Sequence, residues 1–223
     1  MPRRLTLKSI EPVTHDVHHL VFDRPEDYRF TPGQATELRL DQDGWQDEAR
    51  PFSFVSLPED PTLDFMIKSY SDRDGVTRRV AQLQPGDAVL IGDPWGAIAD
   101  RGPGMFIAGG AGITPFVSIL RRRARDRDGL NGCTLIFSNR REEDIILRDE
   151  WQAMPSLSKV FTLTQEDAEG LHRRRIDRDF LEEVVHEREQ HFYVCGPRQM
   201  VRDVSAALAE LGVRKDRVVV EDL

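Results

Sequence analysis

Cysteine is scarce in this 223-residue chain, which contains only Cys133 and Cys195. Two cysteines without a Cys-x-x-Cys pair cannot build a disulfide framework. Two thiolates also cannot hold an iron–sulfur cluster, which usually takes four cysteine ligands. Any redox chemistry within these residues therefore requires an organic cofactor.

Long apolar runs and an excess of positive charge are also missing. The longest apolar stretches, such as Ala88–Gly92 and Val218–Val220, are far too short to span a bilayer. The basic start, Met1–Arg4, is not followed by an apolar segment of signal-peptide length, so we expect a cytoplasmic protein with no membrane partner. The net charge of −8 argues against a nucleic-acid partner, which would need a basic face. We expect the chain to act as a monomer.

Two arginine-rich segments run against the acidic balance, at Arg121–Arg125 and His172–Arg175. The simpler interpretation is a solvated helix end and a solvated loop. The alternative is a docking surface for an acidic partner or for phosphates. Sequence alone does not separate the two.

Three histidines near the start of the chain invite a metal interpretation. His15, His18 and His19 are predicted to fall on a strand, with His15 and His19 on one face and His18 on the other. Zinc needs three or four ligands, and no cysteine or further histidine lies nearby in sequence. We therefore expect no metal site.

The first hundred residues alternate short β-branched and apolar runs with turn signals such as Thr31–Gln34 and Pro85-Gly86. Predicted strands cover Thr6–Pro12, Val17–Phe22, Thr36–Leu40, Phe52–Leu57, Leu63–Ser69 and Ala88–Gly92, with a short helix over Val76–Leu83. Many short strands separated by turns indicate a small antiparallel barrel or sandwich.

The pattern changes near residue 100 to alternating strands and helices. Predicted strands cover Met105–Ala108, Cys133–Ser138, Val160–Thr164, His191–Cys195 and Arg217–Val220, and predicted helices cover Ile113–Arg123, Asp149–Met154, Asp177–His186 and Gln199–Leu211. Such alternation predicts a parallel sheet with helices on both faces. We therefore predict two domains, residues 1–100 and 101–223.

A glycine-rich turn, Gly109–Gly112, joins a predicted strand directly to a predicted helix. Such a turn leaves backbone N–H groups at a helix N-terminus, where the helix dipole favours an anion, and its glycines let a pyrophosphate approach the backbone. The turn is not Gly-x-Gly-x-x-Gly, and it lacks the lysine of an ATPase phosphate loop. Pro115 is well tolerated in the first helical turn. A plain strand-to-helix turn is the alternative.

Two further segments could carry chemistry. Tyr193–Pro197 ends a predicted strand, and the carboxyl ends of parallel strands line the ligand crevice of open sheets. Arg50–Ser53 offers a guanidinium, an aromatic ring and a hydroxyl within four residues. Taken singly, each segment has a simpler explanation. Tyr193–Pro197 would contain a buried core cysteine, and Arg50–Ser53 would contain an exposed arginine and a core phenylalanine.

Taken together, these motifs resemble the ferredoxin–NADP reductase family over nearly the full chain. The family's flavin signature R-x-[YF]-S matches Arg50, Phe52 and Ser53. The other matching segments are Pro32-Gly33-Gln34, Gly75 with Thr77, Pro85-Gly86-Asp87, Gly92–Gly96, Gly109–Pro115, Ser138-Asn139-Arg140 and Tyr193–Pro197. The resemblance implies a flavin-binding antiparallel β-barrel followed by a Rossmann-like NAD(P)-binding α/β domain.

The resemblance also implies a flavin site, with FAD expected and FMN less favoured. Arg50 would bind the flavin pyrophosphate, Phe52 would pack on the isoalloxazine ring, and Ser53 would hydrogen-bond near N5. The remaining flavin contacts would come from Pro51, from the backbone at Ile67 and Lys68, and from the phosphate-holding segment Gly75, Val76 and Thr77.

The implied NADPH or NADH site lies in the second domain. Gly110, Gly112, Ile113, Thr114 and Pro115 would cradle the pyrophosphate and the inner end of the nucleotide. Cys195, Gly196 and Pro197 would lie beside the nicotinamide ring, and Glu221 would approach the same pocket. The residues that the resemblance places in catalysis are Ser53, Cys195 and Glu221.

The choice of nucleotide is less well determined. A 2′-phosphate needs arginine or lysine together with a hydroxyl, and Ser138, Arg140 and Arg141 could supply them, which favours NADPH. Against this, the next predicted strand ends in Thr164-Gln165, where phosphate-binding relatives often have Ser-Arg. Charge pairing of the two arginines with nearby glutamates is the alternative.

Several positions depart from the family pattern. Phe52 stands where a tyrosine is frequent, so the stacking surface is kept but the hydroxyl is lost. Ala35 follows the Pro-Gly-Gln turn, where an aromatic residue is common. The chain ends Glu221-Asp222-Leu223, without the aromatic residue that often covers the flavin, and a plain surface tail is the alternative for Glu221.

The resemblance predicts hydride transfer from NAD(P)H to FAD N5 and delivery onward to an external carrier, such as a ferredoxin, a flavodoxin or an oxygenase component. A stand-alone flavin reductase or diaphorase is one alternative. A non-catalytic electron-relay subunit is another, because a fold alone does not prove catalysis.

Overall fold

The computed structural model describes residues 2–70, 74–96, 98–127 and 129–221. The chain folds into two compact units. The barrel unit comprises Met1–Ala99 with Thr114–Ile119, and the sheet unit comprises Asp100–Ile113 with Leu120–Leu223. Each unit has its own sheet and its own hydrophobic core.

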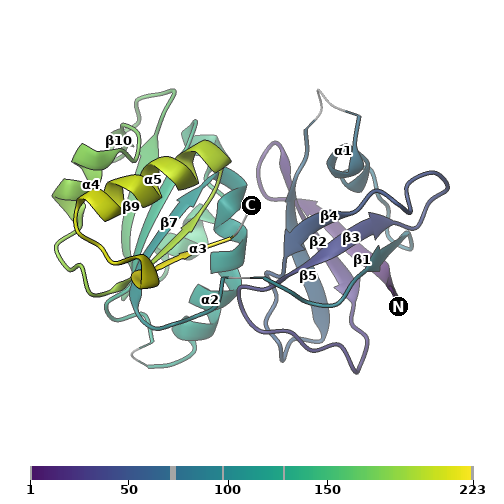
Figure 1. The fold of residues 1–223 in the computed structure, drawn as a ribbon. Helices are drawn as coiled ribbons and strands as arrows, with labels where there is room; N and C mark the ends of the chain where they lie inside the picture. Colours follow the sequence, from purple (N-terminus) through teal and green to yellow (C-terminus); the bar gives the residue numbers. More distant parts are fainter. Residues whose placement is uncertain (1, 71–73, 97, 128, 222–223) are drawn as a thin grey trace. The chain divides into compact units, whose positions relative to one another are not determined.

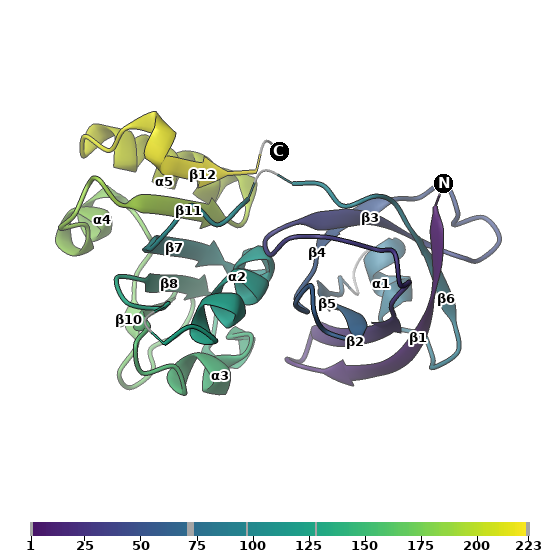
Figure 2. The same cartoon turned by 90° about the horizontal axis from the view of Figure 1, so that it is seen from below.

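The barrel unit is a nearly closed ring of antiparallel strands in the order β4-β3-β6-β1-β2-β5. Its elements are β1 (Arg3–Pro12), β2 (Val17–Asp23), β3 (Ala35–Leu40), β4 (Arg50–Ser53), β5 (Thr62–Lys68), α1 (Val76–Val80) and β6 (Ala88–Ile91). A bridge between Phe54 and Phe65 connects the end of β4 to β5. α1 lies at one end of the barrel (Figures 1 and 2). The predicted fold class is confirmed for this unit, and the near closure protects strand edges that would otherwise pair with other chains.

Phe54 organises the aromatic part of the barrel core. Its ring stacks on Phe30 at 4.3 Å between centroids and contacts the rings of Phe65 at 5.2 Å and Tyr28 at 5.9 Å. All four side chains are buried. Because Phe54 directly follows β4, this packing anchors the segment that carries the predicted flavin signature.

The predicted bounds of the strand at Phe52–Leu57 are wrong. β4 begins at Arg50 and ends at Ser53, with Pro51 opposite Glu37 of β3. Proline lacks an amide hydrogen and is tolerated on edge strands, and β4 is an outer strand of its sheet order. The strand therefore includes the whole signature rather than starting within it.

The histidine prediction also needs correction at one position. His15 lies in the turn before β2, whereas His18 and His19 lie on the strand. His15 therefore does not share a strand face with His19. The Nε2 atom of His19 lies 3.1 Å from the Asp64 carboxylate on β5.

The sheet unit contains parallel strands in the order β10-β9-β8-β7-β11-β12. They are β7 (Gly104–Gly109), β8 (Thr134–Asn139), β9 (Ser158–Leu163), β10 (His172–Arg173), β11 (His191–Cys195) and β12 (Val218–Val220). The chain moves outward from β7 through β8 and β9 to β10, then returns to the other side of β7 for β11. Strand order therefore reverses between β7 and β11, and open α/β sheets bind ligands at such a switch point.

Helices alternate with these strands along the chain, as predicted. They are α2 (Thr114–Ala124), α3 (Arg148–Gln152), α4 (Arg178–Val184) and α5 (Arg198–Glu210), with 3₁₀ turns η1 (Gly110–Ile113), η2 (Glu142–Asp144) and η3 (Lys215–Arg217). Buried side chains of α4 and α5 pack with those of β7, β8 and β11 in one hydrophobic core. Figure 1 shows α4 and α5 in front of the sheet. No helix among the described residues is long and apolar enough to cross a membrane.

The segment His172–Arg175, predicted as a loop, contains a short strand. His172 and Arg173 form β10, which pairs in parallel with Thr162 and Leu163 of β9. Both β10 side chains are exposed. Because this short edge strand buries neither of its side chains, no apolar pattern in the sequence announces it.

Candidate functional site

Three segments that are far apart in sequence meet at the start of β3. Ala35 pairs with Ser53 of β4, and it exchanges two backbone hydrogen bonds with Trp95, at 2.7 and 2.8 Å. Gly33, in the turn before β3, has φ +93°, and a Cβ there would lie 2.4 Å from a backbone oxygen. Only glycine fits that position. The Pro-Gly-Gln turn and the closing glycine segment thus support the signature strand β4.

Arg50 presents its guanidinium to solvent at the start of β4. Its Nη1 donates to the Ala49 carbonyl at 2.6 Å, and its Nη2 lies 3.1 Å from the Glu48 carboxylate. Both charged side chains are about half exposed, and an exposed ion pair of this kind contributes only about 0–1 kcal/mol. A phosphate can therefore replace Glu48 at little cost.

Phe52 and Ser53 take different environments, as alternation along a strand requires. Ser53 is buried and Phe52 is half-buried, with Phe52 packed against the edge of the barrel core. On β5, Ile67 is buried, and the ammonium of Lys68 pairs with Asp16 at 2.5 Å. Both side chains are thus engaged in contacts within the protein.

Gly75 precedes α1 in an extended conformation, with φ −176°. Any residue adopts that backbone, so the fold itself does not require glycine. A Cβ at Gly75 would meet no atom of the described residues within 4 Å. Val76 is buried, and Thr77 is half-buried. The open space beside Gly75 is consistent with the predicted close approach of a ligand.

The glycine-rich turn in the sheet unit is confirmed as strand, turn and helix. β7 runs into η1, and α2 begins at Thr114 with Pro115 in its first turn. Gly110 has φ +52°, and a Cβ there would meet no atom within 4 Å in the part of the chain that the structure describes. A Cβ at Gly112 would lie 2.4 Å from the Cys195 carbonyl oxygen. The next residue, Ile113, is fully buried. Gly112 thus lets the turn pack directly on the end of β11.

The structure brings Cys195 and Glu221 together, which the sequence could not show. Burial, together with the Glu221 carboxylate, raises the pKa of the Cys195 thiol to about 12. Burial also raises the pKa of Glu221 above its ordinary value. Cys195 is therefore a neutral thiol at physiological pH, so its chemistry is not that of a thiolate nucleophile. Asp222 and Leu223, the rest of the tail, lie outside the described residues.

The raised pKa of Glu221 predicts a pH-dependent stability effect. A raised pKa in the folded state means that folding favours the protonated carboxyl, so Glu221 lowers stability as pH rises from its ordinary pKa of about 4.3 through the raised value. Glu221→Gln should therefore raise the melting temperature by a few degrees at pH 8. The gain should vanish as pH falls towards 4.3. Thermal unfolding of both proteins across this range measures it, and a gain that is equal at all pH values would contradict the assignment.

The β8 end carries the residues predicted to choose between nucleotides. Ser138 is half-buried and pairs with Gly109 of β7, whereas Arg140 and Arg141 are exposed. Arg141 lies 3.6 Å from Glu143, in line with the charge-pairing alternative.

Glu166 reaches the same edge of the sheet and was not among the residues predicted from sequence. Its carboxylate accepts a hydrogen bond from the Glu142 backbone N–H. The neighbouring Gln165 N–H donates to the Arg140 carbonyl at 2.9 Å. An acidic residue shortly after a strand end was the available signal, because such residues bind ribose hydroxyls in dinucleotide folds.

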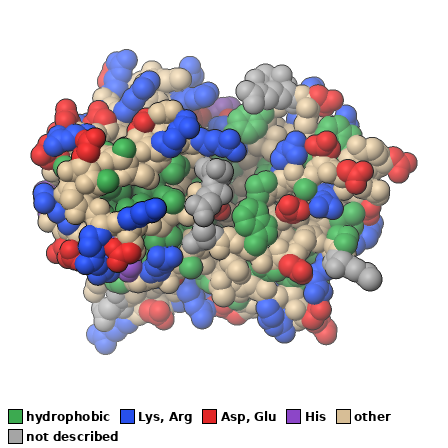
Figure 3. All heavy atoms as spheres, in the orientation of Figure 1, with side chains coloured by type: hydrophobic (Ala, Val, Ile, Leu, Met, Phe, Trp, Pro, Cys, Tyr) green, Lys and Arg blue, Asp and Glu red, His purple; other side chains and the backbone are tan. Residues whose placement is uncertain are grey.

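The arginine-rich segments are largely neutralised by acids from elsewhere in the sheet unit. Arg121 makes a bidentate pair with Glu150, at 2.7 and 2.8 Å, and Arg123 pairs with Asp100 at 2.5 Å. Figure 3 shows basic and acidic side chains interspersed over one face. These pairs favour the interpretation of a solvated surface over that of a dock for an acidic partner.

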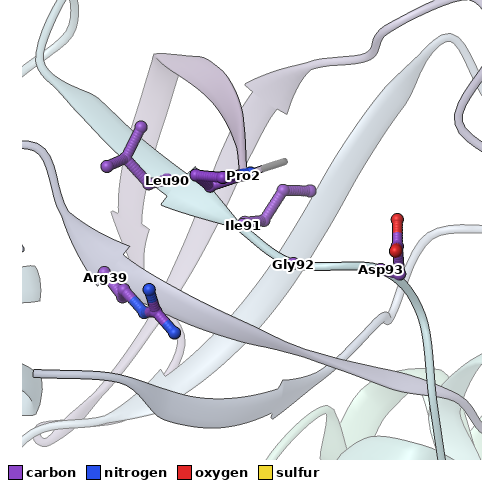
Figure 4. Close-up of a pocket in the computed structure, with 6 residues that line it drawn as sticks. All are labelled: Pro2, Arg39, Leu90, Ile91, Gly92 and Asp93. Atoms are coloured by element: carbon purple, nitrogen blue, oxygen red, sulfur yellow. The ribbon is translucent and has the colours of Figure 1, made fainter. Parts of the chain in front are cut away.

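A surface pocket on the barrel lies beside β3 and β6. Figure 4 shows its lining, which is Pro2, Arg39, Leu90, Ile91, Gly92 and Asp93. Of these, Gly92 and Asp93 belong to a segment that matched the family, and neither was predicted to contact the flavin. We therefore do not assign the flavin to this pocket.

Comparison with known proteins identifies both halves of the chain. The oxidoreductase FAD-binding domain model matches residues 4–99, and the oxidoreductase NAD-binding domain model matches residues 106–206. The chain belongs to the ferredoxin reductase-like family. It is an NAD(P)H-dependent flavoprotein reductase that uses FAD and passes electrons on.

Single relatives of known type are similar to this reductase over most of its length. It is 27% identical to NADH-cytochrome b5 reductase 2 of Mycosarcoma maydis, covering 96% of this chain and 70% of that protein. It is 26% identical to the ferredoxin–NAD(P)(+) reductase component of the naphthalene 1,2-dioxygenase/salicylate 5-hydroxylase systems of Ralstonia sp, covering 93% of this chain and 65% of that protein. A ferredoxin NADP+ reductase from Neisseria gonorrhoeae, solved with FAD and NADP, superposes with a TM-score of 0.82 at 25% identity, covering 99% of this chain and 98% of that one. The reductase thus spans about two thirds of the length of these two curated relatives.

Proposed function

We propose that this reductase delivers electrons from NAD(P)H to an electron carrier that lies outside these 223 residues. The observation that carries the proposal is that an FAD-binding domain and an NAD-binding domain follow each other in one chain. These residues contain only two cysteines. Cys133 and Cys195 cannot hold an iron–sulfur cluster, so the next redox centre lies outside these 223 residues. Relatives named as b5 reductases and as dioxygenase electron-transfer components support a protein acceptor.

On the barrel, we assign the flavin contacts to β4 and to the start of α1. Arg50 binds the pyrophosphate, Phe52 packs on the flavin ring, and Ser53 donates a hydrogen bond near the reactive nitrogen. Gly75 leaves room for phosphate beside Thr77. Bound FAD supplies a hydride acceptor that can hand electrons on one at a time. The exposed guanidinium of Arg50 and the open space at Gly75 fit this group.

On the sheet, we assign nucleotide binding to the η1 turn and the end of β11. Gly110 offers open space for the pyrophosphate, and Thr114 begins the helix whose N-terminus favours its charge. Gly112 packs against Cys195, so a ring bound by the turn lies near the neutral thiol. Glu221 holds a proton more tightly than a free carboxyl does, beside the same thiol. These residues orient the nicotinamide and exclude water from it.

For the nucleotide itself, we propose a preference for NADH. Sequence alone favours NADPH through Ser138 and Arg140, but the Glu166 carboxylate lies at the same edge and would repel a 2′-phosphate. A carboxylate there can instead accept hydrogen bonds from the ribose hydroxyls of NADH.

Glu166→Gln should shift the kcat/KM ratio towards NADPH by roughly tenfold, equivalent to about 1.4 kcal/mol. Steady-state rates with both nucleotides measure the ratio. Glu182→Gln removes an exposed carboxylate on α4 of the same unit and should leave the ratio unchanged. An unaltered ratio in Glu166→Gln would refute the proposed preference.

The acceptor is tested by direct competition between acceptor classes. The purified reductase with NADH should reduce a haem carrier such as cytochrome b5, or a [2Fe–2S] ferredoxin, at least about tenfold more efficiently in kcat/KM than it reduces free FMN. If kcat/KM is higher for free FMN than for every carrier tested, the protein functions as a stand-alone flavin reductase.

A further inference from the structure

The connection between β3 and β4 contains Trp45, which is partly exposed at the surface of the barrel. Backbone hydrogen bonds from Trp45 N–H to Gln42 and from Glu48 N–H to Trp45 fold this connection into successive turns. Trp45 is half-buried and packs against the edge of the barrel core. One face of its indole therefore rests on the protein.

Arg79 of α1 lies over the Trp45 ring. The guanidinium carbon lies 4.1 Å from the ring centroid, well within the range of a cation–π contact. The Arg79 side chain is 37% exposed, and its only other ionic contact among the described residues is Asp74, at 3.6 Å. A planar guanidinium is thus held on an aromatic surface while the arginine side chain stays partly exposed.

This stack stands close to the predicted pyrophosphate site along the chain. Trp45 lies in the same connection that ends at Arg50, and Arg79 lies two residues after Thr77 on α1. The chain segments that bracket the pyrophosphate in the proposed function are therefore the segments that hold the stack. The part of FAD beyond the pyrophosphate is the adenosine half, which ends in a flat aromatic base.

We propose that Arg79, lying on Trp45, is the seat of the adenine ring of FAD, and that this pair makes the reductase select FAD over FMN. The inference rests on the flavin function assigned above. A guanidinium stacks on aromatic faces, so Arg79 can lie between the indole and the adenine. FMN ends at its single phosphate and has no adenine to offer. The stack therefore contributes to the affinity for FAD and not to that for FMN.

Titration of the apoprotein with each flavin tests the inference. Arg79→Ala should weaken FAD binding about 10- to 100-fold, the range for loss of one base-stacking contact, and should leave the FMN dissociation constant within about twofold. Arg79→Lys keeps the charge but not the planar group, so it should recover little of the FAD affinity. Trp45→Phe keeps a ring beneath the guanidinium and should be milder than Arg79→Ala.

Arg78→Ala is the matched control, because Arg78 is an exposed arginine on the same helix. It should leave both affinities unchanged, and melting temperatures check that each variant is folded. Equal weakening for FAD and FMN, or none for either, would overturn the role of the stack. A wild-type protein that binds neither flavin would overturn the flavin function itself, which is a different result.

Discussion

Arg50→Ala is expected to lose its FAD. An arginine that binds a pyrophosphate contributes charge-assisted hydrogen bonds, and removing one partner of such a pair costs about 2–4 kcal/mol, or roughly 30- to 1,000-fold in Kd. Within the protein the guanidinium makes an exposed pair with Glu48 and a hydrogen bond to the Ala49 carbonyl, both with its immediate neighbours in sequence. The substitution should therefore leave the fold intact while lowering flavin affinity.

The measurement is the flavin-to-protein ratio after gel filtration, followed by titration of the apoprotein. Arg39→Ala removes an arginine from the neighbouring strand β3 and should retain full flavin content. FMN should be weakened together with FAD, because both carry the phosphate next to the ribityl chain. Stoichiometric FAD in Arg50→Ala would show that the signature strand does not hold the phosphate.

Cys195→Ala is expected to slow flavin reduction by NAD(P)H by about 10- to 100-fold while FAD stays bound. Displacing a reacting ring by about 1 Å can cost this much in rate. Cys195 ends β11 at the switch point, and its carbonyl is the atom that a Cβ at Gly112 would strike. The thiol therefore belongs to the strand end on which the nucleotide turn packs.

Because the pKa of this thiol is raised to about 12, the effect should not depend on ionisation of Cys195. Cys195→Ser should recover part of the rate, and the rate should show no thiol titration between about pH 6 and 9. Anaerobic stopped-flow absorbance measures the reduction step. Cys133→Ala, at a buried thiol that precedes β8, is the control and should reduce normally. Flavin loss in Cys195→Ala would contradict the division of roles between the units.

The sequence of this reductase predicts well those features whose signals lie in neighbouring residues. The glycine turn Gly109–Gly112 could be recognised because its strand and helix directly flank it, and hydrophobic periodicity marks both. The Arg50–Ser53 segment gained meaning from the ordered motifs that follow it. The exact start of β4 was not predictable, because pairing of Pro51 opposite Glu37 depends on a neighbouring strand.

What the sequence could not predict depends on long-range contacts. Cys195 and Glu221 lie 26 positions apart, and only the fold of the sheet unit brings them together. Glu166 joins the edge after β8 because its carboxylate accepts a hydrogen bond from the Glu142 backbone N–H, a contact that no sequence pattern announces. The cation–π contact of Arg79 with Trp45 likewise connects an α1 arginine to a loop 34 residues earlier.

Anaerobic reduction of the bound flavin is the most direct test of the central claim. The purified protein should be yellow with FAD, its visible flavin absorption should bleach when NADH or NADPH is added without oxygen, and the colour should return when an electron carrier is added. Bound FAD that neither nucleotide bleaches would contradict the account, because the barrel would then hold a flavin that the sheet unit cannot reduce.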